Sequence, residues 1–183
     1  MLLACVLLAC VFPTSHLAFW RYTIYPESYA SQVKLDDYDM SKPPGRTYRY
    51  YTGKPLFEYG QGLSYTTFSM QCKCSGGCSA TPMNFSCTVS NTGDVAGDEV
   101  VMVFHQAGDA IRKGVSHPVP LKSLVQFDRV SLAPGGSATV NFQLTDAAFE
   151  LTTTDGNKTV IAGQRNILFS RGNGDDVSIS VSL

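Results

Sequence analysis

From Phe85 to its last residue, the chain is a succession of short runs in which apolar and polar side chains alternate. In "SATVNFQLT" one face carries only the apolar side chains Ala138, Val140, Phe142 and Leu144. Alternation with a period of two is typical of a strand with one buried face. Sixteen glycines and nine prolines supply the turns between such runs. This spacing of turns leaves no room for a long amphipathic helix after residue 45.

Counting these runs leads to a fold class. The runs are "GLSYTTF", "FSCTVSNTG", "DEVVMVFHQ", "SLVQFDRVSL", "SATVNFQLT", a hairpin candidate around Asp155-Gly156 and the final "VSISVSL", which places Val177, Ile179, Val181 and Leu183 on one face. About seven short strands in about 120 residues is the pattern of an immunoglobulin-like β-sandwich. We therefore predict an all-β fold with an irregular N-terminal extension.

The run "DEVVMVFHQ" differs from the others because it is apolar on both faces. Val100, Met102 and Phe104 alternate with Val101 and Val103. Such a strand is covered on both sides, or its outer face meets another domain.

Residues 44–69, "PGRTYRYYTGKPLFEYGQGLSYTTFS", contain five of the nine tyrosines and six glycines or prolines. The segment is too interrupted for a helix and too aromatic for a solvated linker. An exposed aromatic strip of this size needs a partner, since monomers rarely leave large apolar patches bare. We expect Leu63, Tyr65 and Phe68 to fold back over the sandwich, with Leu63 to Phe68 as its first strand.

The first residues, "MLLACVLLACVF", form an apolar run that ends at Pro13. A membrane span needs about 20 residues, so no transmembrane segment is predicted, whereas the length suits a signal peptide. The alternative is a buried strand or helix belonging to a preceding domain. A signal peptide over residues 1–18 would make the protein secreted.

The remaining cysteines and two sequons agree with an oxidising compartment. Cysteines in even number within a Gly/Ser-rich segment favour disulfides, and "CKCSGGC" lacks the paired spacing of a zinc site. One of them, Cys87, alternates with apolar residues and could instead be a buried thiol. Asn84 and Asn157 begin "NFS" and "NKT", which permit glycosylation in a secreted chain. The disulfide candidates are Cys72, Cys74, Cys78 and Cys87.

Other residue patterns exclude several functions. A net charge of −1 gives no basis for nucleic-acid binding. The acidic run Asp36, Asp37 and Asp39 lacks the spacing of a calcium loop and suits a solvated turn. His105 and His117 have no nucleophile nearby in sequence, and "GQGLS" does not open a helix as a phosphate loop would. No cofactor or metal is predicted.

The segment "PGRTYRYYTGKPLFEYGQGLSYTTF" resembles the junction of glycoside hydrolase family 3 enzymes, where the chain leaves an α/β sandwich domain and enters a C-terminal fibronectin type III-like domain. The blocks "VSNTGDVAGDEVVMVF", "PLKSLVQFDRVSLAPGGSATVNFQL" and "AGQRNILFSRGNGDDVSISVSL" resemble that domain in order. Upstream, "IYPESY" and "VKLDDYDM" resemble the β-xylosidase-like branch. The resemblance covers about residues 24–183.

This resemblance implies an immunoglobulin/fibronectin type III-like domain over residues 63–183. Residues 19–62 would be the junction and the remnant of the preceding domain. Enzymes of the family hydrolyse β-glucosides, β-xylosides or α-arabinosides with two carboxyl groups, one of them in a barrel of about 250 residues that cannot fit here. No residue of this chain therefore takes a catalytic role by resemblance.

Two functions follow, and the first is favoured. In the first, which the resemblance implies, the chain would be the structural C-terminal part of a β-xylosidase/β-glucosidase-like enzyme that breaks down xylan or related polysaccharides, and its junction would dock on the catalytic domains. The alternative is a stand-alone extracellular module in which tyrosines bind a carbohydrate or protein surface. The docking candidates are Arg46, Tyr48, Tyr50, Tyr51, Phe57 and Tyr59.

Overall fold

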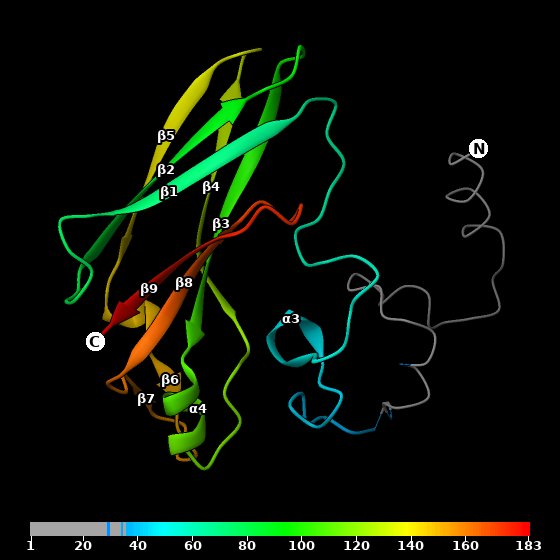
Figure 1. The fold of residues 1–183 in the computed structure, drawn as a ribbon. Helices are drawn as coiled ribbons and strands as arrows, with labels where there is room; N and C mark the ends of the chain where they lie inside the picture. Colours follow the sequence, from blue (N-terminus) through cyan, green and yellow to red (C-terminus); the bar gives the residue numbers. More distant parts are fainter. Residues whose placement is uncertain (1–28, 30–33, 35) are drawn as a thin grey trace, which may run out of the picture.

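The computed structural model describes residues 29, 34 and 36–183, which fold into a sandwich of two antiparallel sheets (Figure 1). The three-stranded sheet has the order β1-β2-β5 and the four-stranded sheet the order β4-β3-β8-β9. These strands are β1 (Phe68–Ser75), β2 (Met83–Asn91), β3 (Gly97–Ala107), β4 (Ser123–Leu132), β5 (Ser137–Leu144), β8 (Gln164–Ser170) and β9 (Val177–Ser182). The predicted all-β sandwich of about seven strands is confirmed.

The core lies between the two sheets and is rich in phenylalanine. Phe169 of β8 lies with its ring centroid 5.4 Å from Phe85 of β2 and 6.0 Å from Phe142 of β5. All three rings are buried. The apolar faces predicted for β5 and β9 point into this core, so alternation identified the buried side of both strands correctly.

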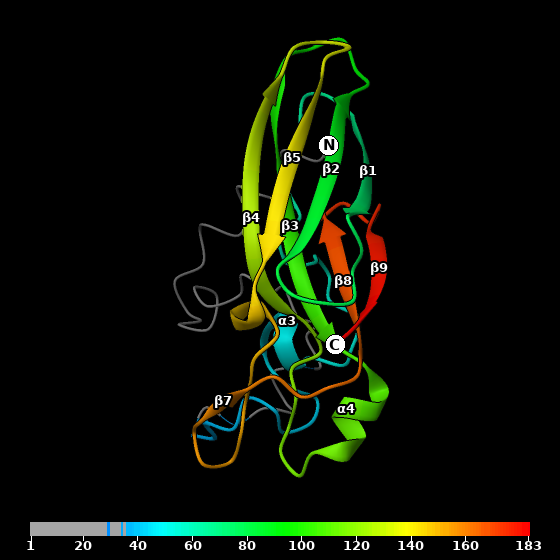
Figure 2. The same ribbon diagram turned by 90° about the vertical axis from the view of Figure 1, so that its left-hand side faces the viewer.

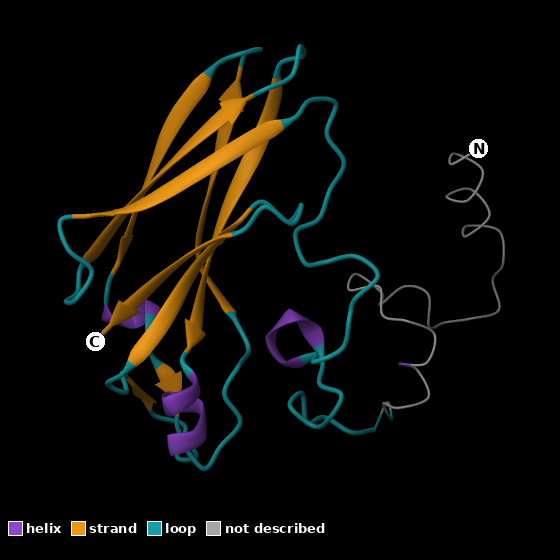
Figure 3. Ribbon diagram, in the orientation of Figure 1, coloured by secondary structure: helices purple, strands orange, loops and turns teal. Residues whose placement is uncertain are grey.

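Short elements lie together at one end of the sandwich (Figure 3). The predicted hairpin is present as β6 (Leu151–Thr152) paired with β7 (Lys158–Thr159). A helix α4 (Asp109–Gly114) follows β3, and a 3-10 helix η2 (Asp146–Ala148) follows β5. Among the described residues, none of the helices has the length and apolar character that a membrane crossing requires.

The first strand differs from the prediction. β1 begins at Phe68, not Leu63, because the ladder with β2 starts at the pair Phe68↔Asn91, where β2 ends. Leu63 and Tyr65 have no strand to pair with and are fully exposed, so the expectation that they fold back over the core is wrong. The strand instead runs on to Ser75, which places two of the cysteines in the sheet and not in a loop.

The N-terminal extension approaches the sandwich from one side. A single helical turn, α3 (Thr47–Tyr50), lies beside the four-stranded sheet, on the side away from β1, β2 and β5 (Figures 1 and 2). The predicted signal peptide, residues 1–18, lies outside the described residues. Domain limits at residues 18 and 62 remain a proposal.

Candidate functional site

The outer face of β3 is the place where the extension meets the sandwich. Val101 and Val103 point into the core, whereas Met102 and Phe104 point the other way, yet only 7% and 1% of these two side chains are exposed. The strand is therefore buried on both faces, as its sequence predicted. The second cover comes from residues 45–61 of the same chain, which we call the cover.

Two tyrosines of the cover lie on Phe104. The ring centroids of Tyr48 and Tyr59 are 5.7 Å and 6.2 Å from that of Phe104, both edge to face. The two tyrosine rings are stacked at 4.3 Å on each other. The Nζ of Lys122 lies 5.0 Å from the centre of the Phe104 ring. Such aromatic contacts stabilise by about 0.5–1.5 kcal/mol each beyond the area they bury.

Backbone groups also attach the cover to the sheet. The amide of Leu121 donates to the carbonyl of Arg49 at 2.5 Å, and the amide of Leu124 donates to the Oη of Tyr48 at 3.3 Å. Leu121 precedes β4 and Leu124 lies within it. The cover is thus joined to the edge strand β4 as well as to the centre of the sheet.

Two glycines allow the cover to cross the sheet closely. Gly60 and Gly172 have φ values of +85° and +77°, which side chains rarely adopt. A Cβ on Gly60 would lie 2.2 Å from the Cε of Met102, and one on Gly172 would lie 2.4 Å from the carbonyl carbon of Gly60. One glycine of "GQGLS", Gly60, and one glycine of "RGNGDD", Gly172, therefore allow close packing.

A buried arginine holds the corner next to this crossing. Arg171 forms an ion pair of 2.7 Å with Glu99 at the start of β3 and another with Asp175, and it donates to the carbonyl of Phe68 at 3.0 Å. Burial alone would lower the pKa of its guanidinium, but the two carboxylates raise it overall. This network connects β1, β3 and the loop after β8, and periodicity in the sequence gave no sign of it.

Behind the cover, His105 and Arg165 are buried inside the domain. The guanidinium of Arg165 donates to the carbonyls of Phe149 and Ile161 and lies 5.7 Å from the Phe149 ring. Burial, together with the nearby charge of Arg165, lowers the pKa of His105 to about 4. A histidine in this position lacks access to an external substrate, so it does not suit general acid or base catalysis.

The six docking candidates separate into different roles. Tyr48 and Tyr59 pack on the chain's own sheet, and Tyr51 contacts Tyr29 with ring centroids 5.3 Å apart. Arg46 donates to the carbonyl of Lys34 at 2.7 Å, and Tyr50 is half-buried near Arg49. Among the six, Phe57 exposes the most, with 51% of its side chain accessible.

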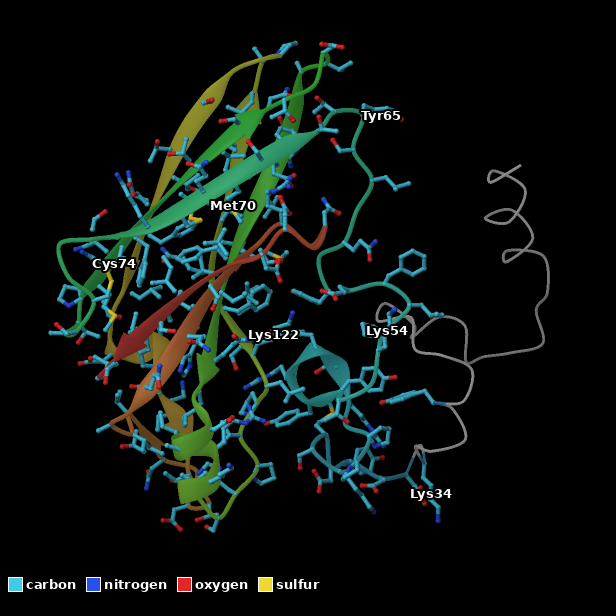
Figure 4. The ribbon with its side chains drawn as sticks, viewed as in Figure 1. Lys34, Lys54, Tyr65, Met70, Cys74 and Lys122 are labelled. Atoms are coloured by element: carbon cyan, nitrogen blue, oxygen red, sulfur yellow. A yellow bond between two sulfur atoms is a disulfide. The ribbon has the colours of Figure 1, made fainter. Side chains whose placement is uncertain are left out.

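A second group of apolar side chains in the same region faces outward. Figure 4 shows Tyr65 pointing away from the sandwich at the upper end of the junction. We call this group the exposed edge; its members and exposed fractions are Leu56 59%, Phe57 51%, Leu63 106% and Tyr65 98%. An apolar group of this kind is typical of an interaction surface.

The four cysteines form two disulfides, Cys72–Cys87 and Cys74–Cys78. The first joins directly opposite residues of β1 and β2. Both sequon asparagines are exposed, and Asn84 accepts a hydrogen bond of 3.1 Å from the amide of Gln143. Their glycosylation stays a prediction.

The acidic run contributes to a turn. Asp37 pairs with Lys42 at 2.6 Å, which lowers the pKa of its carboxyl, and Asp39 accepts hydrogen bonds from Ser41. Within the part of the chain that the structure describes, no three His, Cys, Asp or Glu side chains come together as a metal site would require.

Comparison with known proteins identifies what this fold resembles. The fibronectin type III-like domain family matches residues 99–171. The chain is 35% identical over 164 residues to the exo-1,4-β-xylosidase bxlB of Emericella nidulans, covering 80% of the chain and 21% of that protein. It spans about one fifth of the length of the fungal relatives it matches.

Solved structures give the same result. A β-glucosidase from Erythrobacter marinus superposes with a TM-score of 0.65 at 29% identity, covering 81% of this chain and 20% of that one. A glycoside hydrolase family 3 β-glucosidase from Bifidobacterium adolescentis superposes with a TM-score of 0.59 at 28% identity, covering 68% of this chain and 18% of that one.

Proposed function

This chain contains a fibronectin type III-like domain and belongs with the C-terminal region of glycoside hydrolase family 3 enzymes, and we propose that it docks on the catalytic domains of such an enzyme without contributing reacting groups. The names of the relatives support a β-xyloside or β-glucoside as the substrate class of the whole enzyme. The domain's role is structural, namely to complete the surface on which the catalytic domains pack.

The observation that carries this proposal is the exposed edge. Leu63 and Tyr65 leave nearly all of their surface in solvent, although their neighbours Tyr59 and Phe68 are packed on the sandwich. Burying apolar surface stabilises a complex by about 25 cal/mol per Å², so these residues favour binding of a partner that excludes water from them. The catalytic domains are the partner that the junction position favours.

Secretion is part of the proposal. Two disulfides form within β1, β2 and the loop between them, and disulfides persist in oxidising compartments. The fungal xylosidase relatives are compatible with an extracellular location. Detection of the protein in culture medium, with these four cysteines resistant to alkylation, would support secretion. Retention of the reduced protein inside cells would contradict it.

A graft tests the docking role. In this chimera, the chain replaces the matching segment of the Emericella nidulans xylosidase. We would measure its turnover of an aryl β-xyloside and the midpoint of its thermal unfolding. We expect Leu63→Asp with Tyr65→Asp to lower the midpoint by several degrees, because two charges enter a buried contact at a cost of about 2–4 kcal/mol.

The matched control is Val95→Asp, which places one charge at an apolar site with 51% exposure outside the junction. It should leave the midpoint of the graft unchanged. Equal midpoints for both variants would overturn docking through the exposed edge. Separately, the isolated chain should not hydrolyse aryl β-xyloside or β-glucoside, and turnover above background would contradict a purely structural role.

A further inference from the structure

Two adjoining hollows lie on the outer face of the four-stranded sheet, and together we call them the groove. One has a volume of about 250 Å³ and lies between the cover and the sheet. The other, of about 580 Å³, lies between α4 and strands β8 and β9. They share Gln106 and Leu121 in their walls. A ligand that reaches both hollows must pass over these two residues, so the groove suits an extended ligand rather than a compact one.

The end of the groove under the cover is aromatic. Tyr48, Tyr51 and Tyr59 form its wall, and 37% of Tyr59 is exposed. Figure 4 shows Lys122, which lines the same end, between the sheet and α3. Tyrosine combines an apolar ring face with a hydroxyl that hydrogen-bonds, which suits a ligand with both C–H faces and hydroxyl groups.

The other end carries a row of neutral polar side chains. Gln106, Asn166 and Ser180 lie directly opposite one another on β3, β8 and β9. Ser180 donates to the Oδ1 of Asn166 at 2.8 Å, which leaves the amide Nδ2 of Asn166 available. Within the described residues, the side-chain amide of Gln106 makes no hydrogen bond. Both amides can donate to and accept from ligand hydroxyls.

Apart from the buried Arg165, the charged side chains along the groove balance. Glu58 and Lys122 line the aromatic end, and Asp109 and Arg112 line the polar end. The guanidinium of Arg165 is engaged with carbonyls on the inner side. A groove without a dominant sign of charge gives no preference for an anionic or cationic ligand.

From this arrangement we propose that the groove binds a neutral, linear oligosaccharide, with sugar rings against the tyrosines and hydroxyls on the Gln106–Asn166–Ser180 row. The site would hold substrate chains near the enzyme without acting on them. This inference goes beyond the docking role and does not depend on it. Aromatic walls with a few convergent polar groups are the general character of ligand sites.

The test is an NMR titration of the complete chain, labelled with ¹⁵N, with xylotetraose and with cellotetraose in separate experiments. At least one of the two should produce saturable shifts at the amides of Gln106, Tyr59 and Asn166. Gln106→Ala and Ser180→Ala should each weaken the apparent affinity about two- to tenfold, as expected for loss of one hydrogen bond.

The matched control is Asn141→Ala, which removes an exposed amide from the outer face of the opposite sheet. It should bind like the unmodified chain, and the spectrum of each variant reports whether it is folded. Absence of saturable shifts with both sugars, or equal affinities for Gln106→Ala, Ser180→Ala and Asn141→Ala, would overturn the proposal. Because the titration uses the chain by itself, its result is independent of the graft.

Discussion

The two faces of β3 are buried in different ways. Toward the core, Val101 and Val103 pack within a cluster supplied by both sheets, and strand pairing fixes their neighbours within their own sheet. On the outer face, Met102 and Phe104 are covered by a loop whose position depends on two tyrosines and two glycines. Regular strand pairing thus positions the residues of the core, whereas a few individual contacts position the cover.

This difference suggests that the junction both packs on the sandwich and presents apolar side chains to a partner. Its first part, residues 45–61, packs on the sandwich through Tyr48 and Tyr59, although Leu56 and Phe57 within it face solvent. Its second part leaves Leu63 and Tyr65 in solvent. The cover therefore positions the exposed edge, and its attachment should be weaker than the core that it covers. Substitutions in the core and in the cover can test this difference in stability.

The largest effect is expected in the core. Phe169→Ala removes a fully buried ring between Phe85 and Phe142 and should lower the free energy of unfolding by about 3–5 kcal/mol. Urea denaturation followed by circular dichroism measures it. Phe127→Ala is the control, since 66% of that ring is exposed, and should change stability by less than about 0.5 kcal/mol. Similar values for both would refute the assigned core.

Acid should destabilise the domain through His105. The pKa of His105 is about 4 in the folded domain and 6.5 in the unfolded chain. Between these pH values the unfolded chain therefore binds more protons than the folded domain. The free energy of unfolding should therefore fall by about 3 kcal/mol as pH decreases from 6.5 to 4. Urea midpoints across this range measure the slope.

His105→Gln is the control for this pH dependence. The variant lacks the titrating ring, so the part of the slope between pH 6.5 and 4 that His105 causes should disappear even if the variant is less stable at neutral pH. An unchanged slope would mean that another group titrates in this window.

The close crossing should have an intermediate effect. Gly172→Ala combines a positive φ with a clash against the backbone of Gly60, whereas Gly174→Ala has a positive φ of +87° but open space around it. Unfolding experiments should show that Gly172→Ala costs about 1–3 kcal/mol more than Gly174→Ala. Equal costs would mean that the cover does not lie against Gly172.

The smallest effect is the coupling within the cover. A double-mutant cycle with Tyr59→Leu and Phe104→Leu should give a coupling energy of about 0.5–1.5 kcal/mol, because the rings lie 6.2 Å apart edge to face. The cycle of Tyr59→Leu with Phe169→Leu, on opposite faces of the sheet, is the reference and should be near zero. A coupling no larger than the reference would argue against the aromatic contact.

The sequence predicted the regular part of this molecule well. Alternation identified the buried faces of β5 and β9, and the apolar outer face of β3 correctly indicated a second cover. The buried face of a strand can be predicted from sequence because successive side chains point to opposite faces. Burial of one face therefore requires apolar residues at every second position.

The contacts of the junction were not predictable in the same way. Nothing local distinguishes Tyr59, which packs on Phe104, from Tyr65, which is exposed; the difference depends on where the chain crosses at Gly60 and where pairing with β2 begins. The Arg171–Glu99–Asp175 network joins residues far apart in sequence. The groove likewise combines side chains from three strands with the cover.

Hydrogen exchange of the isolated chain tests the division of the junction most directly. The amides of Tyr51, Thr52 and Gln61, all in the cover, donate to backbone carbonyls, whereas those of Leu63 and Tyr65 donate none within the described residues. We predict that the first three exchange at least about tenfold more slowly than the last two. Equally fast exchange in both sets would contradict a cover that belongs to the sandwich.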